Sequence, residues 1–573
     1  MSRPPSNHAP ESPPSMSRVP SYIQFVPKRA MASFDNLVVL ANYEERLRDA
    51  KKAVWRDRGE KPVEVCDVWE CVEHASRGGL RAGSLAFAIR AGINFFLLLT
   101  RMHKVPRSYR LRLIRHAVFG EEPLRFAAMI GSFVGLYKLI LNALPIVLRG
   151  PDDEEEERQF RARLRESKRP ATNETILEEE SDDMPSVSRV PRPGRLSTSA
   201  KAHQEWLHKR TQRWYSVLAG AVAGAIAIRC ESSDRRISIA QQMFVRGLQG
   251  SYNTISDRIG FRIPNGDVMV FALCCAQIMY GFTMRPDILP RWYNSWIGIA
   301  CKVSPAGTSI NRTMTREGRF SLADIDKIIS RSDITPGNMT RLQHARDLAT
   351  LPTPFFGPPL PPCAAIHPAV DSCLSAQLYF FGKVFAWMFP IYGTLHLIPM
   401  VLFKREAMRL KPLKMFIRAF LGTTRSSAFL GIFVIIYHSW LCSKRNMYLT
   451  LSALRSSMSH TFLGSLASVV PQAFINFLAS KPAYWVGGMM SGFALFFEEK
   501  RRRSELAMYV LPRGLEAAWV MLRGKGYAFH TGSVGDVILT SLGMGMVMVS
   551  RVNDPEHLSG LVRRILYQFV GPN

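Results

Sequence analysis

The sequence lacks the motifs by which soluble enzymes are usually recognised. It contains no Gly-x-Ser-x-Gly nucleophile elbow, no phosphate loop, no dinucleotide fingerprint and no paired-histidine metalloenzyme motif. Acidic residues are also scarce, because 46 Asp and Glu stand against 74 Lys and Arg. We therefore expect a non-enzymatic protein, with no catalytic residues, no cofactor and no assigned metal ligands.

Cysteines are few, and their positions do not form the regular pairs of a disulfide-bonded domain. There are nine cysteines in 573 residues, and several, such as Cys230, Cys274, Cys275 and Cys442, lie in or beside apolar segments. An odd number placed in this way does not form the disulfide framework of a secreted protein. The first 34 residues are rich in proline and serine and have no apolar core typical of a signal peptide, so we expect a disordered tail there.

Long apolar runs dominate the rest of the chain, although its mean hydropathy is near zero. These runs lack the period-2 alternation of barrel strands and are apolar enough for membrane helices, although several are shorter than the ideal of about 20 residues. The fold class we predict is all-α, a polytopic helical membrane protein. The predicted segments are Leu85–Leu99, Ala127–Leu148, Tyr215–Ile228, Val268–Met284, Leu374–Phe403, Ser427–Leu441, Phe462–Leu478, Trp485–Phe497 and Val537–Val549.

A long internal repeat divides the membrane part into two halves. Gly220, Arg235 and Arg246 recur 267 residues later as Gly487, Arg502 and Arg513, and Gly266-Asp267-Val268 recurs as Gly535-Asp536-Val537. Upstream, Arg125 and Gly131 to Tyr137 recur 300 residues later as Arg425 and Gly431 to Tyr437. A unit of this length indicates a duplicated domain, which in membrane proteins builds a pseudo-symmetric bundle.

The domain organisation follows from the repeat and from the polar stretches. We predict a disordered tail (1–35), a soluble helical lead-in (36–74), a first membrane repeat (75–303) containing a disordered charged insertion (150–210), a polar and proline-rich linker (304–362) and a second membrane repeat (363–573). Within the linker, Leu322–Arg331 has the pattern of a short helix.

The net charge of +28 is concentrated at equivalent places in the two halves. The loop from Arg101 to Arg115 has no acid, and the loop from Lys404 to Arg418 has one, Glu406. Such loops orient a membrane protein and contact anionic headgroups. The arginines have no accompanying aromatic platform, which argues against nucleic acid as a partner. The partners we expect are membrane lipids, a second copy of the chain or other organelle membrane proteins.

Three sets of residues are candidate sites. Gly220 and Gly224, and Gly488 and Gly492, have the spacing that brings two helices close together, so we interpret them as helix-packing residues. Candidate lipid or path contacts are the arginines Arg235, Arg236, Arg246, Arg502, Arg503 and Arg513. A charge at the depth of Arg246 or Arg513 needs water, phosphate or a carboxylate, and Glu516 is a local partner for Arg513.

The third set is a cysteine and histidine cluster, Cys363, His367 and Cys373, with a looser counterpart at Cys66, Cys71 and His74. Both residue types are zinc ligands, but neither set has the paired close spacing of structural zinc sites. We therefore favour a local structural role and leave a metal site or a redox pair as the alternatives.

With these residues laid out, the chain resembles the transmembrane protein 135 family, also described as a peroxisomal membrane protein family. The resemblance covers roughly residues 65–300 and 363–550 and is carried by three segments: Cys363 through His367-Pro368 and Ser372-Cys373 to Phe385–Tyr392, then Gly431-x-Phe433-x-x-x-Tyr437, and then Ser491-Gly492-Phe493-Ala494-Leu495 through Tyr509 to Gly514. The glycine helix with trailing basic residues is also similar to mitochondrial inner-membrane import channel subunits. The resemblance implies a multi-spanning protein of the peroxisomal or mitochondrial membrane, linked to lipid or sterol handling and organelle dynamics.

Two further functions remain open from the sequence. A transporter or channel would have its path between the two halves, with Arg246 and Arg513 facing water. A membrane enzyme would use Cys363, His367 and Cys373. The orientation of the two halves separates the first of these from a scaffold, since inverted repeats are typical of secondary transporters.

Overall fold

The structure is a computed structural model that describes residues 68–102, 106–148, 213–403, 405–456 and 470–571. Every regular element among these residues is a helix, so the all-α prediction is confirmed for this part of the chain. The predicted tail (1–35), nearly all of the lead-in (36–74) and the charged insertion (150–210) lie outside the described residues. So does the first part of the apolar segment Phe462–Leu478.

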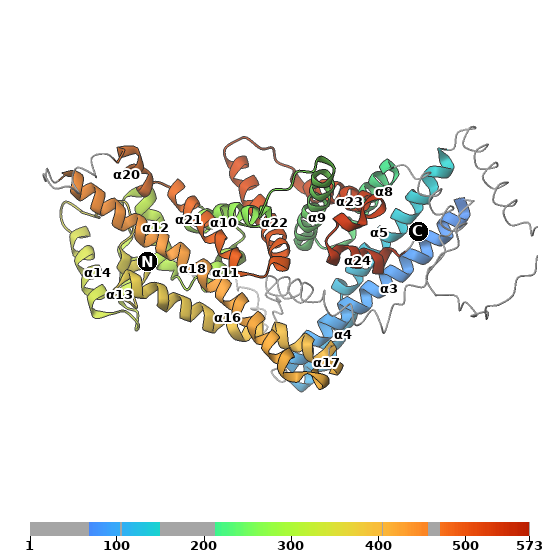
Figure 1. Cartoon of the computed structure of the whole chain (residues 1–573), viewed down its shortest axis with the longest axis horizontal. Coiled ribbons are helices and arrows are strands. Elements are labelled where there is room, and N and C mark those ends of the chain that lie inside the picture. The colour runs from blue at the N-terminus through green and yellow to red at the C-terminus, as the bar shows by residue number, and fades with distance from the viewer. Residues whose placement is uncertain (1–67, 103–105, 149–212, 404, 457–469, 572–573) are drawn as a thin grey trace, which may run out of the picture.

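Two long helical hairpins form the arms of the molecule. In the first, α3 (Val68–Arg101) and α5 (Glu121–Val147) flank the short helix α4 (Arg107–Phe119). In the second, α16 (Cys373–Phe403) and α18 (Pro412–Ser456) flank α17 (Arg405–Leu410). The two arms slope toward each other, and α4 and α17 lie at the same lower edge of the molecule (Figure 1).

Between the upper parts of the arms lies a bundle of six helices (Figure 1). Within it, helices that are far apart in the sequence pack on one another. Helices α8 (Arg213–Ala227) and α9 (Ser233–Ile259) both pack on α23 (Gly535–Asn553). Helices α21 (Pro482–Gly492) and α22 (Lys500–Gly524) both pack on α10 (Gly266–Met284). In both contacts, two helices from one part of the chain pack on a helix from the other part. The early and late parts of the chain therefore share these cores.

Short elements complete this frame. Two helices, α11 (Arg291–Ala300) and α24 (Gly560–Val570), follow α10 and α23, and α24 packs on the first hairpin. Turns of 3-10 helix, η3 (Ile228–Cys230) and η5 (Phe493–Phe497), follow α8 and α21. The 3-10 turns η4 (Pro286–Ile288), η6 (Gly532–Val534) and η7 (Pro555–His557) and the helix α20 (Gln472–Ala479) occupy other connections.

The connector at 304–362 is a folded unit and not only a spacer. It contains α12 (Pro305–Glu317), α13 (Leu322–Ile329) and α14 (Pro336–Ala349), followed by α15 (Cys363–Ile366). Ser304 and Thr335 cap α12 and α14 through their side-chain oxygens. The four-helix unit buries its own core, which includes Ile310, Ile325, Ile328 and Leu342. The short helix predicted at Leu322–Arg331 is confirmed as α13.

Five of the described helical segments are long and apolar enough to cross a membrane: Val68–Leu99, Ser108–Val147, Gly266–Met284, Pro412–Arg455 and Gly535–Asn553. Their number and composition are those of an integral membrane protein. The predicted spans at Tyr215–Ile228 and Trp485–Phe497 fall on α8 and α21, which have 15 and 11 residues. Both are shorter than the roughly 20 residues that a bilayer requires.

Candidate functional site

The four glycines of the two small-residue pairs lie at helix contacts. A Cβ atom on Gly224 would lie 2.9 Å from the Cβ of Met544 on α23. A Cβ atom on Gly488 would lie 2.8 Å from the backbone oxygen of Cys275 on α10. Gly220 and Gly492 meet the same two helices, α23 and α10. These glycines thus permit the backbone approach that helix packing in a membrane requires.

A buried glutamate stands at the start of the basic cluster after α8. Only 1% of Glu231 is exposed, and its carboxylate lies 3.5 Å from the guanidinium of Arg235. Arg236 donates from Nε to the backbone oxygen of Glu231 at 2.8 Å and from its terminal nitrogen to that of Arg229 at 3.2 Å. Both arginines are therefore engaged in closing the corner between α8 and α9.

The corner after α21 is built in the same way. Glu498 is 3% exposed and lies 3.3 Å from Arg502, which also donates to Ser426 on α18 at 2.8 Å. Arg503 donates to the backbone oxygens of Glu498 and Phe496 at 3.1 and 2.7 Å. Sequence reasoning missed Glu231 and Glu498, although they share the 267-residue spacing of the arginines beside them.

Arg246 and Arg513 form a polar layer where α9 runs beside α22. Arg246, 5% exposed, donates to the carboxylate of Glu505 on α22 at 2.6 Å and to Gln249 at 3.0 Å. Arg513 donates to Glu516 at 2.5 Å, which confirms the predicted local partner. It also reaches Ser238 and Gln241 on α9 at 3.3 and 3.5 Å. Each arginine thus bonds to one residue on its own helix and to at least one on the other, so the two arginines link α9 to α22.

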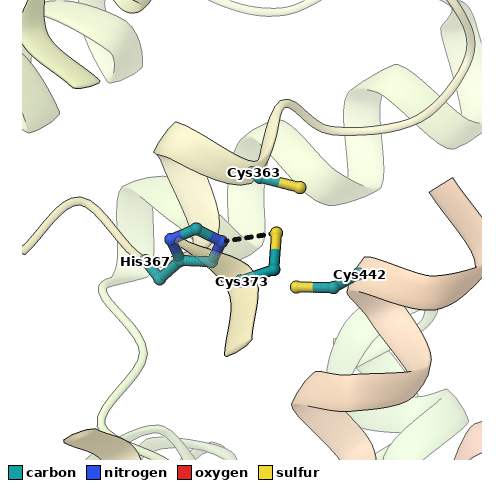
Figure 2. A group of neighbouring side chains, drawn as sticks. All are labelled: Cys363, His367, Cys373 and Cys442. Atoms are coloured by element: carbon teal, nitrogen blue, oxygen red, sulfur yellow. Dashed lines mark hydrogen bonds between the residues drawn. The ribbon is translucent and has the colours of Figure 1, made fainter. Parts of the chain in front are cut away.

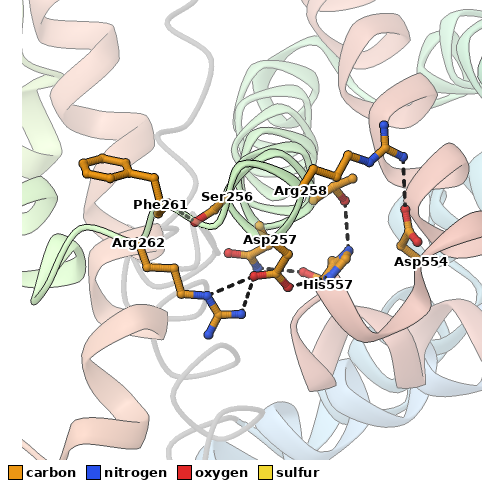
Figure 3. Close-up of polar contacts among 9 residues, drawn as sticks. Ser256, Asp257, Arg258, Phe261, Arg262, Asp554 and His557 are labelled. Atoms are coloured by element: carbon orange, nitrogen blue, oxygen red, sulfur yellow. Dashed lines mark hydrogen bonds and ion pairs between the residues drawn. The ribbon is translucent and has the colours of Figure 1, made fainter.

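A second polar contact links the end of α9 to η7 (Figure 3). The carboxylate of Asp257 accepts from Nε of Arg262 at 2.9 Å and lies 2.8 Å from Nε2 of His557. Hydrogen bonding from Arg262 lowers the pKa of Asp257. Asn253 donates to the backbone oxygen of His557 at 2.8 Å, and Arg258 lies 3.9 Å from Asp554. These contacts fix the chain after α23 to the bundle.

The cysteine and histidine cluster gains a fourth member from a distant helix. Cys363 begins α15, His367 follows its last turn, Cys373 begins α16, and Cys442 projects from α18 (Figure 2). The four ligand atoms all lie within 4.8 Å of one another, and Sγ of Cys373 lies 3.4 Å from Nε2 of His367. His367 and Cys442 are buried, and Cys363 and Cys373 are half-buried. The structure therefore unites a dispersed set of three thiols and one imidazole.

The backbone around this cluster is held by side chains outside it. The imidazole Nδ1 of His367 lies 2.7 Å from the backbone oxygen of Val370, an arrangement that leaves Nε2 facing the sulfurs. The Asn338 side chain donates to the backbone oxygens of His367, Pro368 and Val370 at 3.0–3.2 Å. Arg445, one turn beyond Cys442, donates to the backbone oxygens of Leu360 and Pro361, both at 2.9 Å.

The close approach of the thiols changes their proton affinities. Hydrogen bonding from Cys442 lowers the pKa of Cys363 to about 4, in opposition to burial, which raises it. The pKa of Cys373 is raised by burial and by the negative charge of Cys363. Burial lowers the pKa of His367, whereas its hydrogen bonds to Cys363 and to the backbone of Val370 raise it. The hydrogen bonds outweigh burial, so the pKa of His367 is raised overall. The cluster therefore favours an anionic sulfur at Cys363, the form that binds cations.

The looser counterpart set does not assemble in the same way. Cys66 lies outside the described residues, and Cys71 and His74 are on α3. Nε2 of His74 lies 3.2 Å from Nζ of Lys138 on α5. Within the described residues, Cys363, His367, Cys373 and Cys442 are the one group of three or more such side chains that could hold a metal ion.

Comparison of the chain with protein-family models, with curated proteins and with solved structures gives no match.

Proposed function

We propose that the protein is a non-enzymatic multi-pass organelle membrane protein that supports lipid or sterol handling and peroxisomal or mitochondrial dynamics. The membrane part of this proposal draws on the five helices long enough to span a bilayer. The organelle and the process draw on the resemblance to the transmembrane protein 135 family.

We further infer that the membrane part consists of two sequence-related halves in parallel orientation. The succession α3, α4, α5, α8, α9, α10 in the first half has the counterpart α16, α17, α18, α21, α22, α23 in the second. The corners at Glu231 and Glu498 support the same correspondence, because their arginines make matching hydrogen bonds. In Figure 1 the counterparts α4 and α17 lie at the same edge, as expected for parallel halves.

The surface at this edge carries the lipid proposal. On α4, Leu111 is 81% exposed and lies among the exposed cations Arg112 and Arg115. At the start of α18, Leu413 is 72% exposed and lies between the exposed cations Lys411 and Lys414. Apolar side chains interleaved with cations suit the interface of a membrane containing anionic lipids.

The alternative, a transporter or channel with a path between the halves, has less support from the polar layer. Arg246 is bonded to Glu505 and Gln249, and Arg513 to Glu516, Ser238 and Gln241. Such pairing stabilises a closed contact between α9 and α22, so a path there would require these bonds to break.

The orientation of the halves is tested by labelling single cysteines at Ser108 and Lys411 with a membrane-impermeant maleimide in isolated organelles. Cys363, Cys373 and Cys442 are retained so that the clustered thiols stay intact, and the same background without an added cysteine is the control. Labelling of both sites from one face is the expected result. Labelling from opposite faces would make the halves inverted and would favour transport.

The lipid contact is tested by mass spectrometry of lipids that co-purify with the full chain. We expect enrichment of anionic lipids, which falls when Arg112, Arg115, Lys411 and Lys414 are changed to glutamate. Changing the exposed Arg319 and Lys327 of the connector to glutamate is the matched control. Equal lipid content in all three proteins would contradict the proposed role of the hairpin tips.

A further inference from the structure

The donor set of the cysteine and histidine cluster is one that structural zinc sites use. Three thiols and one imidazole form a Cys₃His set, which occurs in tetrahedral structural zinc sites. The group contains no carboxylate, the side-chain ligand that suits magnesium or calcium. We propose that Cys363, His367, Cys373 and Cys442 bind one structural zinc ion.

The spacing of the ligand atoms agrees with this coordination. Zn–S bonds of about 2.3 Å and Zn–N bonds of about 2.0 Å in a tetrahedron separate the ligand atoms by roughly 3.5–3.8 Å. The Cys373 Sγ to His367 Nε2 separation is 3.4 Å, and no pair of ligand atoms exceeds 4.8 Å. The cluster is thus within a small adjustment of a closed four-ligand shell.

The supporting hydrogen bonds are those that a zinc site uses. Metal-bound histidines usually donate their other ring N–H to a carbonyl or carboxylate, which fixes the tautomer and the ring orientation. Here Nδ1 of His367 faces the backbone oxygen of Val370 at 2.7 Å. The loop carrying that oxygen is held by Asn338, and Arg445 holds the residues that precede Cys363.

The position of the site gives the metal a structural role. Because α17 connects α16 to α18, the start of α16 and the later part of α18 form the open end of the second hairpin. Cys373 and Cys442 lie one on each of these two helices, and Cys363 and His367 lie at the two ends of α15, which packs with the connector helices. Zinc would therefore tie the connector and both helices together at the end of the hairpin opposite the cationic tip.

The test is the metal content of the full chain, purified in detergent through a tag without histidines and measured by inductively coupled plasma mass spectrometry. We expect about one zinc per chain. Cys442→Ser and Cys373→Ser should each lower this at least roughly tenfold, whereas Cys230→Ser, at a free cysteine outside the cluster, should leave it unchanged. The His367→Cys variant should retain zinc, because four thiolates also form a structural zinc site.

A second readout does not depend on how well a variant folds. Wild-type protein grown with cobalt should show the charge-transfer absorption of cobalt–thiolate bonds, and added zinc should abolish it. Wild-type protein that contains neither zinc nor bound cobalt would overturn the proposal, as would zinc content that is the same in Cys442→Ser and Cys230→Ser. A disulfide among Cys363, Cys373 and Cys442 in protein from the native membrane would also overturn it and would identify a redox pair instead.

Discussion

At the scale of single residues, a few buried charges of the helical bundle have partners of opposite charge. Arg246 and Glu505 come from helices far apart in the sequence and meet at 2.6 Å. Desolvation of a buried ion pair offsets most of its attraction, so such a pair adds little net stability but is costly to break. We therefore interpret this pair as a device that selects one packing of α9 against α22.

Replacing Arg246 with methionine should leave Glu505 without its partner and destabilise the protein by about 3 kcal/mol. The double variant Arg246→Met with Glu505→Leu should recover most of this loss. Denaturant titration of the protein in detergent measures the free energy of unfolding. The control is Arg319→Met, since the Arg319–Glu317 pair is well exposed and such pairs contribute about 0–1 kcal/mol. Equal effects of the two single variants would argue against a buried pair at Arg246.

At the scale of elements, small residues decide how closely helices approach. The long apolar helices could be predicted from sequence, because an apolar run in a membrane must satisfy its backbone hydrogen bonds within its own helix. The segments predicted as spans at α8 and α21 are too short to cross a bilayer as described, because each helix gives way to a 3-10 turn before it reaches about 20 residues. The glycine spacing indicated a packing face but not which helix would cover it.

Gly488→Ala should destabilise the contact between α21 and α10 by about 1–3 kcal/mol. The new methyl group would lie 2.8 Å from the backbone oxygen of Cys275 and 2.9 Å from Cα of Ala276, and backbone atoms cannot rotate away. Gly382→Ala in α16 is the matched control, since its Cβ would meet nothing within 4 Å and alanine is the better helix former. Thermal unfolding in detergent compares the two. A Gly488→Ala protein as stable as Gly382→Ala would show that α21 is not held against α10.

At the scale of the whole molecule, the early and late parts of the chain complete each other. The glycine helix α8 is covered by α23, and α21 is covered by α10. The buried faces of α8 and α10 are thus closed by helices that follow the connector. Because helices of each part are covered by helices of the other, we expect that neither part is stable alone.

Residues 1–303 and 304–573, each expressed alone, should aggregate or be degraded, because each exposes a helix face that the other covers. Co-expressed, the two fragments should co-purify in equal amounts, as measured by size-exclusion chromatography in detergent. The Arg246→Met change in the first fragment should weaken this association, since its partner Glu505 lies in the second. A first fragment that is monodisperse and fully helical by itself would contradict the conclusion that its helices need those of the second fragment.

The sequence by itself determined which segments are helical and apolar, where cations gather, and that residues recur at a spacing of 267. These properties are local or repetitive, so they can be recognised in the sequence without knowing the tertiary structure. Only the tertiary structure decided which helices pair, that Arg246 meets Glu505 across 259 positions, and that Cys442 joins Cys363, His367 and Cys373. Cys363, His367 and Cys373 lack the paired close spacing of structural zinc sites, and the sequence could not add Cys442 to them, because helix packing brings it there and leaves no periodic signal in the chain.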